Sequence, residues 1–155
     1  MALGSSPFPV GRAWAVTLCF LVNLAPVPIL LTFSDATWAD DKADLLETVD
    51  AYFRSEKEGD IQKVWELLAP SSEFKKAYSY PFYQEMVRRN PAMLKDYKID
   101  GVLEIRDNDD AAGLPNVQKI ALVQVTVTLA GIGPRDLTQV RVFTFLKEAG
   151  KWFKG

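Results

Sequence analysis

Apolar residues recur at helical spacing after about the first quarter of the chain and predict a first amphipathic helix over about residues 41–58. Asp40 or Asp41 is in position to cap the start of this helix by accepting from its free main-chain amides. The apolar stripe consists of Leu45, Leu46, Val49, Tyr52 and Phe53. A single stripe of this kind predicts a helix that packs one face on a core and leaves the other in water.

The next segment predicts a sharp corner and a second helix. Gly59 is expected as the residue after the first helix, in a left-handed conformation, and Asp60 as the cap of the second helix. The second helix should end at Pro70, and its apolar face consists of Ile61, Val64, Leu67 and Leu68.

Two shorter helices are predicted before the pattern changes. The first should be capped by Ser71 or Ser72. The second should begin at Pro81, which suits a first helical position, and end at Asn90. One further helical turn is expected over residues 92–95.

From Tyr97 onward, apolar residues recur at every second position, and this alternation predicts strands. The expected strands cover residues 97–106, 117–129, 137–147 and 151–154. Short connections between consecutive strands favour antiparallel pairing. Helices followed by such a meander predict an α+β domain, with N-terminal helices packed on an antiparallel sheet of about four strands.

The N-terminal segment reads as an export signal over residues 1–39. Arg12 precedes an apolar run over 13–31, and small residues at Thr37 and Ala39 suit signal peptidase. The mature domain would then cover residues 40–155, in the periplasm or outside the cell. Two alternatives remain open: a retained membrane anchor formed by residues 13–31, and lipidation at Cys19.

Composition narrows the chemistry available to this chain. The formal net charge of −2 gives no electrostatic basis for binding nucleic acid or anionic membrane. The 155 residues include no histidine, which removes the usual general base near neutral pH, and the one cysteine, Cys19, lies in the segment expected to be removed. There is no glycine-rich phosphate loop. We therefore expect no cofactor and no metal.

The order of these features resembles the NTF2-like superfamily (nuclear transport factor 2-like, cystatin-like α+β cone), and in particular its exported bacterial domains. The resemblance lies in the Gly59-Asp60 corner, the second helix ending in Leu67-Leu68-Ala69-Pro70, and the closing Gly150-Lys151-Trp152-Phe153. It implies a strongly curved sheet wrapped around the helices, with a pocket at the wide end. The family includes enzymes and non-catalytic binders, so the fold alone does not assign a function.

Aromatic residues of the helical region are the candidate ligand-binding residues. The residues predicted to line an apolar pocket are Tyr52, Trp65, Tyr78 and Tyr83. The alternative is that these rings fill the core between the helices and the sheet, which is the commoner use of aromatic residues at helical spacing.

Two carboxylates of the first strand are the candidate catalytic groups. Asp100 and Glu104 lie on one strand face by the period of two, and either could serve as a base beside a tyrosine if that face were the concave one. The alternative, which the pattern favours, is that both point to solvent while Ile99, Leu103 and Ile105 point inward.

Both faces of the central strands carry apolar residues. The second strand has a clean face of Ala121, Val123, Val125 and Val127, whereas Ile120 and Leu122 lie on the opposite face; on the third strand, Val140, Val142 and Leu146 share one face. A homodimer through the outer sheet face would explain this pattern, and so would a mixed face on a curved sheet.

Three functions are consistent with the sequence. The first is a non-catalytic exported domain that binds a small apolar ligand or a protein partner. The second is an enzyme of the isomerase or dehydratase kind that uses a pocket carboxylate with a tyrosine. The third is a structural accessory domain of a cell-envelope assembly. The absence of histidine and of a recognisable acid–base set favours the first.

Overall fold

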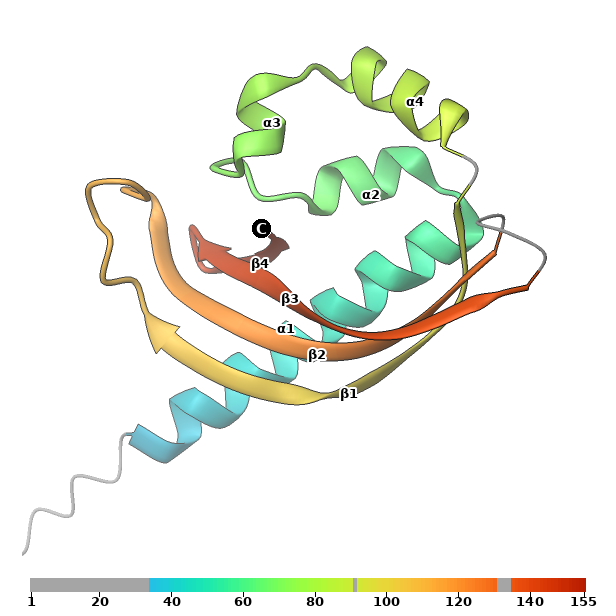
Figure 1. Ribbon diagram of the computed structural model, residues 1–155. Helices are drawn as coiled ribbons and strands as arrows, with labels where there is room; N and C mark the ends of the chain where they lie inside the picture. The colour runs from blue at the N-terminus through green and yellow to red at the C-terminus, as the bar shows by residue number, and fades with distance from the viewer. Residues whose placement is uncertain (1–33, 91, 131–134) are drawn as a thin grey trace, which may run out of the picture. The chain divides into compact units, whose positions relative to one another are not determined.

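The computed structural model describes residues 34–90, 92–130 and 135–155. Four helices precede four strands, and the strands form one curved sheet (Figure 1). The predicted α+β class, with helices packed on a curved antiparallel sheet, is confirmed. The expected signal segment lies almost wholly outside the described residues, and so does the turn at 131–134. No helix in the described part of the chain has the length and apolar character to cross a membrane.

The helices are α1 (Ser34–Glu58), α2 (Ile61–Leu67), α3 (Glu73–Ala77) and α4 (Tyr80–Arg89). The predicted corner is present: Gly59 has a φ of 73°, and the Asp60 side chain accepts from the Lys63 amide at 3.0 Å. Ser72 caps α3 by accepting from the Lys75 amide at 3.2 Å. Pro81 lies within the first turn of α4, as predicted.

The strands are β1 (Met93–Asp107), β2 (Val117–Ala130), β3 (Leu137–Glu148) and β4 (Lys151–Lys154), paired antiparallel in the order β1-β2-β3-β4. The β3–β4 connection is a two-residue turn in which Ala149 and Gly150 have φ values of 48° and 79°. Positive φ at both central residues matches the right-handed twist of the flanking strands. β4 therefore returns along β3 and ends inside the curve of the sheet (Figure 1).

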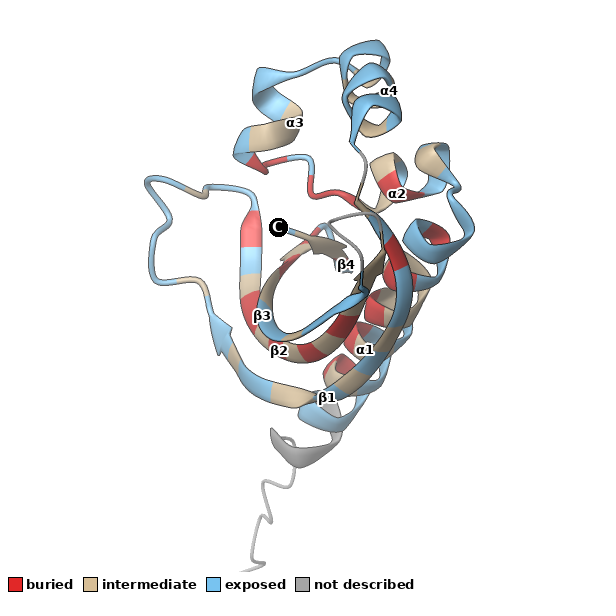
Figure 2. Cartoon of the chain, turned by 45° about the vertical axis from the view of Figure 1, so that its right-hand side comes forward, coloured by how far each residue is buried: buried red, intermediate tan, exposed pale blue. Residues whose placement is uncertain are grey.

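The main core lies between α1 and the inner face of the sheet. Leu45, Val49 and Phe53 of α1 are buried, as are the four inner residues of β2, Ala121, Val123, Val125 and Val127. Figure 2 shows these buried positions on α1 and on the strands that face it. The helical stripe and the clean face of β2 are thus the two surfaces that the fold brings together.

The outer face of the sheet is covered at one end by the chain itself. Ile120 and Leu146 pack with Ala69, which belongs to the segment between α2 and α3. The Ser71 hydroxyl in this segment donates to the buried Glu148 carboxylate at 2.5 Å and ties it to β3. Farther along the same outer face, Val140 and Val142 remain exposed, and their exposed fractions are 62% and 53%.

Three bulges in β1 change which of its side chains face inward. The pairing with β2 skips Lys95, Asp100 and Leu103. Each inserted residue shifts the alternation by one position. The inward residues are consequently Leu94, Tyr97, Ile99, Val102 and Ile105. The prediction that Leu103 points inward is wrong: this side chain is 56% exposed, and Val102 takes the inner position instead.

Three further local predictions are wrong. α1 begins at Ser34, so Asp40 and Asp41 lie within the helix and do not cap its start. The expected helical turn over residues 92–95 is absent because β1 begins at Met93 and pairs there with Ala130. α2 ends at Leu67, before Pro70, because Leu68 adopts an extended conformation and forms a bridge with Lys154 of β4.

Candidate functional site

A cavity of about 350 Å³ lies between the C-terminal end of α1, α2, α4 and the start of β1. Its lining includes Glu56, Ile61, Val64, Tyr83, Val87 and Leu94. Polar and charged residues complete the lining: Ser55, Lys57, Glu58, Arg88 and Asn90. Small-molecule sites combine apolar side chains with polar groups that orient the ligand. We call this space the Glu56 cavity.

Glu56 is the carboxylate that gives this cavity its chemistry. Burial among surrounding protein atoms raises the pKa of Glu56, and the nearby Lys154 ammonium partly opposes that rise. Within the described residues, the carboxylate makes no ion pair and no side-chain hydrogen bond, although its neighbours Arg54 and Lys57 are paired with Asp50 and Asp96. Glu56, an exposed residue, thus borders this cavity without a side-chain partner among those residues.

Two tyrosines lie beside Glu56. Burial, with the charge on Glu56 as a second cause, raises the pKa of Tyr83 to about 12 and raises that of Tyr52 as well. Both phenols therefore remain protonated at neutral pH and are available as hydrogen-bond donors. Their rings are held by other aromatic rings: Trp65 lies 5.3 Å from Tyr83 and Phe145 lies 6.5 Å from Tyr52, between ring centroids.

Lys154 lies on the inner face of the sheet and is not part of the lining of the Glu56 cavity. It pairs with Phe145 across the β3–β4 ladder, so both side chains project to the inner face. Its ammonium donates to the Gly155 carbonyl and lies 5.8 Å from the centre of the Phe143 ring. Burial lowers the pKa of Lys154, and the charge on Glu56 opposes this. In the described part of the chain, Lys154 forms no ion pair with a carboxylate.

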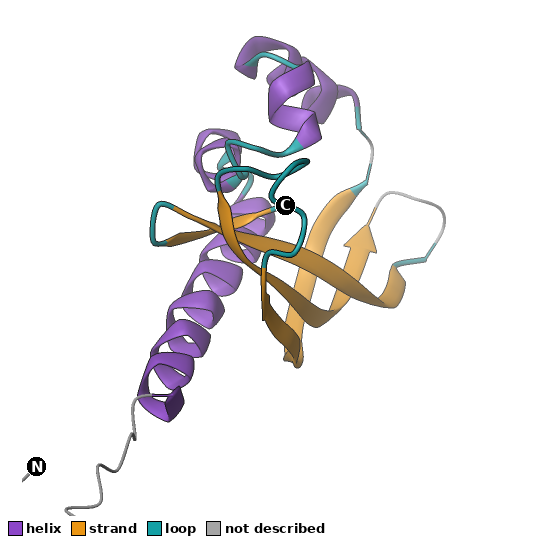
Figure 3. Cartoon of the chain, turned by 90° about the vertical axis from the view of Figure 1, so that its left-hand side faces the viewer, coloured by secondary structure: helices purple, strands orange, loops and turns teal. Residues whose placement is uncertain are grey.

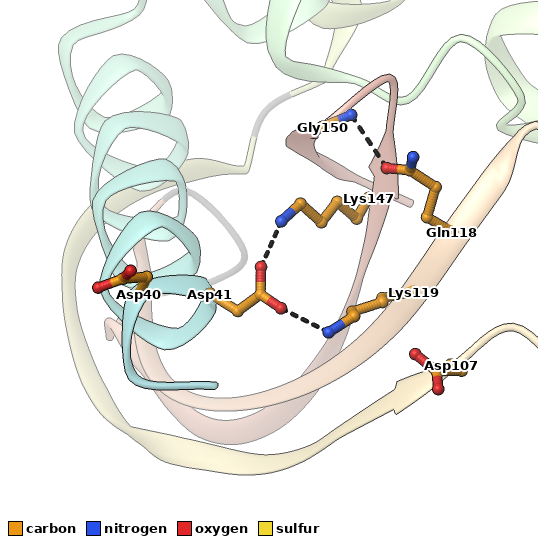
Figure 4. Close-up of a pocket in the computed structure, with 7 residues that line it drawn as sticks. All are labelled: Asp40, Asp41, Asp107, Gln118, Lys119, Lys147 and Gly150. Atoms are coloured by element: carbon orange, nitrogen blue, oxygen red, sulfur yellow. Dashed lines mark hydrogen bonds and ion pairs between the residues drawn. The ribbon is translucent and has the colours of Figure 1, made fainter. Parts of the chain in front are cut away.

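A second, polar pocket lies at the other end of the inner face (Figure 4). Here the buried Asp41 carboxylate lies between two lysines, Lys119 at 2.6 Å and Lys147. The indole of Trp152 donates to the Asp41 carbonyl at 3.1 Å. In the same pocket, Gln118 accepts from the Gly150 amide at 3.0 Å, and Asp40 projects away from the lysines.

The charges of this second pocket satisfy one another. Burial of the Asp41 carboxyl alone would raise its pKa, but hydrogen bonds and charge from Lys119 and Lys147 outweigh burial and lower the pKa. The pairing fastens α1 to β2 and β3 and gives the Asp41 carboxylate two cationic partners. We therefore assign this pocket a structural role and place the candidate functional site at the Glu56 cavity.

The four predicted ligand-binding residues are distributed unevenly around the cavity. Tyr83 is part of the lining. Tyr52 is half-buried next to Glu56, and Trp65 packs behind Tyr83. Tyr78 lies on the surface, 43% exposed, and stacks on Phe82 with 4.7 Å between ring centroids. Of the four, Tyr83 lines the cavity, whereas Tyr52, Trp65 and Tyr78 are not part of its lining.

The two candidate catalytic carboxylates lie away from the cavity. Asp100 is one of the bulge residues of β1, where it accepts from the Thr126 hydroxyl at 2.7 Å and pairs with Lys98. Glu104 is exposed beside Arg106, at 3.7 Å. Neither side chain contributes to the lining of the Glu56 cavity.

The sequence did not single out Glu56 because Glu56 stands among other charged residues. The segment Ser55-Glu56-Lys57-Glu58 reads as the solvated end of a helix. A signal was present, since Glu56 is four residues after Tyr52 and three after Phe53, which places it on the edge of the apolar stripe. For Lys154, the strand pairing that turns it inward is not visible in the sequence.

Comparisons with known proteins assign no family to this chain. No family model matches it, and no curated protein matches it. Among solved structures, an LEH-like epoxide hydrolase from M. tuberculosis is 14% identical, with a TM-score of 0.43 over 73% of this chain and 80% of that protein. RPA3114, a SEC-C motif containing protein from Rhodopseudomonas palustris, is 12% identical, with a TM-score of 0.44 over 76% of this chain and 88% of that one. At these scores, neither likeness carries an argument about function.

The chemistry of the site follows from its groups. The Glu56 cavity offers the carboxylates of Glu56 and Glu58, the phenol of Tyr83 and the cations of Lys57 and Arg88 beside its apolar side chains. Such groups can bind and orient a small molecule, and a carboxylate with a raised pKa can also exchange a proton. In the described ranges, no group of three or more acidic residues is arranged to hold a metal ion.

Proposed function

We propose that this chain is a non-catalytic, exported domain of the NTF2-like type that binds a small, largely apolar ligand in the Glu56 cavity. The observation that carries the proposal is the cavity itself, a space of about 350 Å³. Apolar side chains such as Ile61, Val64 and Leu94 line one part of it, and polar and charged groups line the rest. A volume of this order suits a small organic molecule.

Filling the cavity tests this proposal. Val87 lines it, whereas Met86, the preceding residue of α4, is 41% exposed and is not in the lining. The change V87W should abolish binding of an uncharged, environment-sensitive dye such as Nile red, and M86W should leave it intact. Fluorescence titration measures both. Equal dye binding by the two variants would contradict the assignment of the cavity.

A second function, acid–base catalysis, is favoured by one specific observation: the pKa of Glu56 is raised by burial beside two tyrosines. In this alternative, Glu56 would act as general base and Tyr83 would donate to a developing oxyanion. The change E56Q would then remove turnover of a carbonyl substrate, while D100N and E104Q would not. Turnover that survives E56Q would eliminate this alternative.

We further propose that the exposed part of the outer sheet face binds a second copy of the chain. Val140 and Val142 are exposed there, and the facing row of β2 is uncharged, with Gln124 and Thr126 opposite the two valines. These two uncharged rows, with the Lys98–Asp100 pair of β1 beside them, can pack on the same rows of a second copy about a two-fold axis. Light scattering should report a dimer that V140K combined with V142K dissociates. A monomer at high protein concentration would contradict this.

Export rests on the pattern of residues 1–39. The proposal is that this segment directs the domain out of the cytoplasm and is then removed, leaving a mature chain that begins near Asp40. Mass spectrometry of protein recovered from its own host tests it. A chain that retains Met1 would instead favour the anchor formed by residues 13–31.

A further inference from the structure

The residues that line the Glu56 cavity differ in charge according to their burial. Three of them are buried: Ser55 of α1, Val64 of α2 and Leu94 of β1. The charged residues of the lining are all exposed, and they are Glu56, Lys57, Glu58 and Arg88. We call the three buried residues the inner wall and the four charged residues the rim. The inner wall is therefore uncharged, and the charges of the cavity lie at its rim.

The Ser55 hydroxyl is the polar side-chain group of the inner wall, and Ser55 is only 8% exposed. Within the described residues this hydroxyl forms no hydrogen bond, whereas the Thr48 hydroxyl, two turns earlier in α1, donates to the Asp44 carbonyl at 3.0 Å. In the same part of the chain, every fully enclosed side-chain oxygen or nitrogen has a partner. The Ser55 oxygen is thus not fully enclosed, and because Ser55 lines the cavity, its hydroxyl opens onto that space.

The main chain fixes the position of this hydroxyl. The Ser55 carbonyl accepts from the Asp60 amide at 2.9 Å, across the corner that joins α1 to α2. Val64 and Leu94 supply apolar surface from two other elements. A buried hydroxyl is unfavourable until it is hydrogen-bonded, so this wall is complementary to an apolar group that carries one oxygen.

We propose that the ligand of the Glu56 cavity is an uncharged alcohol whose apolar end lies against the inner wall, and that Ser55 determines this specificity by hydrogen bonding to the ligand oxygen. A ligand hydroxyl can either donate to serine or accept from it. A carboxylate would be disfavoured, because Ser55, Val64 and Leu94 present no charge to it. This assignment rests on the proposed ligand-binding function and adds the chemical class of the ligand.

Three probes that share one ring system test the assignment by equilibrium dialysis against the full-length chain at pH 7. They are 2-naphthol, whose hydroxyl is uncharged at this pH, naphthalene, which lacks the oxygen, and 2-naphthoate, which carries a charge. We expect 2-naphthol to bind most tightly of the three. Naphthalene leaves the Ser55 hydroxyl without a partner, and 2-naphthoate brings a charge to an uncharged wall.

Removing the hydroxyl connects this preference to Ser55. S55A should lower the ratio of 2-naphthol affinity to naphthalene affinity about fivefold, the size expected for one neutral hydrogen bond, and should leave naphthalene binding unchanged. T48A is the matched control, because it removes a hydroxyl from the same helix outside the lining, and it should leave the ratio unchanged. Circular dichroism establishes that each variant is folded, and the comparison of probes on the unaltered chain depends on no variant.

Several results would overturn the ligand class. One is binding of naphthalene or 2-naphthoate to the unaltered chain as tightly as 2-naphthol. Another is a ratio that S55A leaves unchanged. A third is equal weakening of 2-naphthol and naphthalene by S55A, since that would show that Ser55 supports the shape of the wall and does not recognise the oxygen.

The dye distinguishes failure of this assignment from failure of the function on which it rests. If none of the three probes binds while Nile red still binds in a manner sensitive to V87W, the ligand class fails and the cavity assignment stands. If the dye also fails to bind, the proposed function fails with it.

Discussion

Two charged sites at opposite ends of α1 show how the same type of side chain serves different purposes. At one end, Asp41 is buried between Lys119 and Lys147 and its pKa is lowered. At the other end, Glu56 faces a cavity without a paired cation and its pKa is raised. Figure 3 shows the length of α1 that separates the start of the helix from the helices at its far end.

The difference lies in what each carboxylate does for the folded state. Asp41 is stabilised by its partners, so its charge favours folding. Glu56 is charged at a position where burial disfavours the charge, so it reduces stability slightly while it supplies a polar group to the proposed binding cavity. A site that reduces stability while remaining open to water is a better candidate for function than one whose charges are fully paired.

The largest expected effect comes from removing the paired carboxylate. D41A leaves Lys119 and Lys147 without their partner and should reduce the free energy of unfolding by about 3 kcal/mol, toward the lower end for broken buried pairs because both lysines are partly exposed. Urea denaturation measures the change. D44A, at an exposed position one turn away, is the control and should alter stability by under about 0.5 kcal/mol. Equal losses in both variants would contradict the structural role of Asp41.

The pH dependence of stability should separate the two carboxylates. The folded pKa of Asp41 is below its usual 3.8, so its contribution is present above that pH and is lost as the pH falls through the folded value. The folded pKa of Glu56 is above its usual 4.5, so its unfavourable charge is relieved as the pH falls from neutral toward 4.5.

Denaturant melts across the acid range test this expectation. On moderate acidification, the unfavourable effect of Glu56 on the free energy of unfolding should diminish. Below about pH 4, the favourable effect of Asp41 on the free energy of unfolding should be lost. E56Q should lack the gain in stability on moderate acidification, and D41N should show a smaller loss of stability below about pH 4. A profile that is identical in all three proteins would show that neither carboxylate has a pKa perturbed by folding.

The smallest expected effect is the stability of the cavity variant at neutral pH. E56Q should leave stability unchanged or increase it by under about 1 kcal/mol, a value reduced because the side chain is open to solvent. D41N, by contrast, should reduce stability at neutral pH. A clear loss of stability in E56Q would indicate that Glu56 has a structural partner and would weaken its assignment to binding.

The succession of helices and strands could be predicted from the sequence to a large extent. The Gly59-Asp60 corner, the Ser72 cap, the antiparallel meander and the buried face of β2 all follow from local preferences and from apolar periodicity. These features depend on residues close to one another in the chain. The site was harder to predict, because Tyr83 reaches Glu56 only through the packing of α4 over α1 and α2.

The first strand shows most clearly where periodicity fails. Strict alternation predicts Leu103 inside, but bulges at Asp100 and Leu103 turn Val102 inward instead. Bulges bend a strand and increase its twist, so they accompany the curvature that lets the sheet follow α1. Their positions depend on the register with β2, which no local pattern in β1 specifies.

The sequence by itself determined which surfaces of this protein are apolar and therefore which faces must meet. Only the tertiary structure decided which charges at the margins of those surfaces find partners. The physical reason is that hydrophobic burial depends on area and is tolerant of register, whereas an ion pair requires two groups within a few ångströms. Asp41 meets that requirement with Lys119 and Lys147, and Glu56, on the same helix, does not meet it with Lys154.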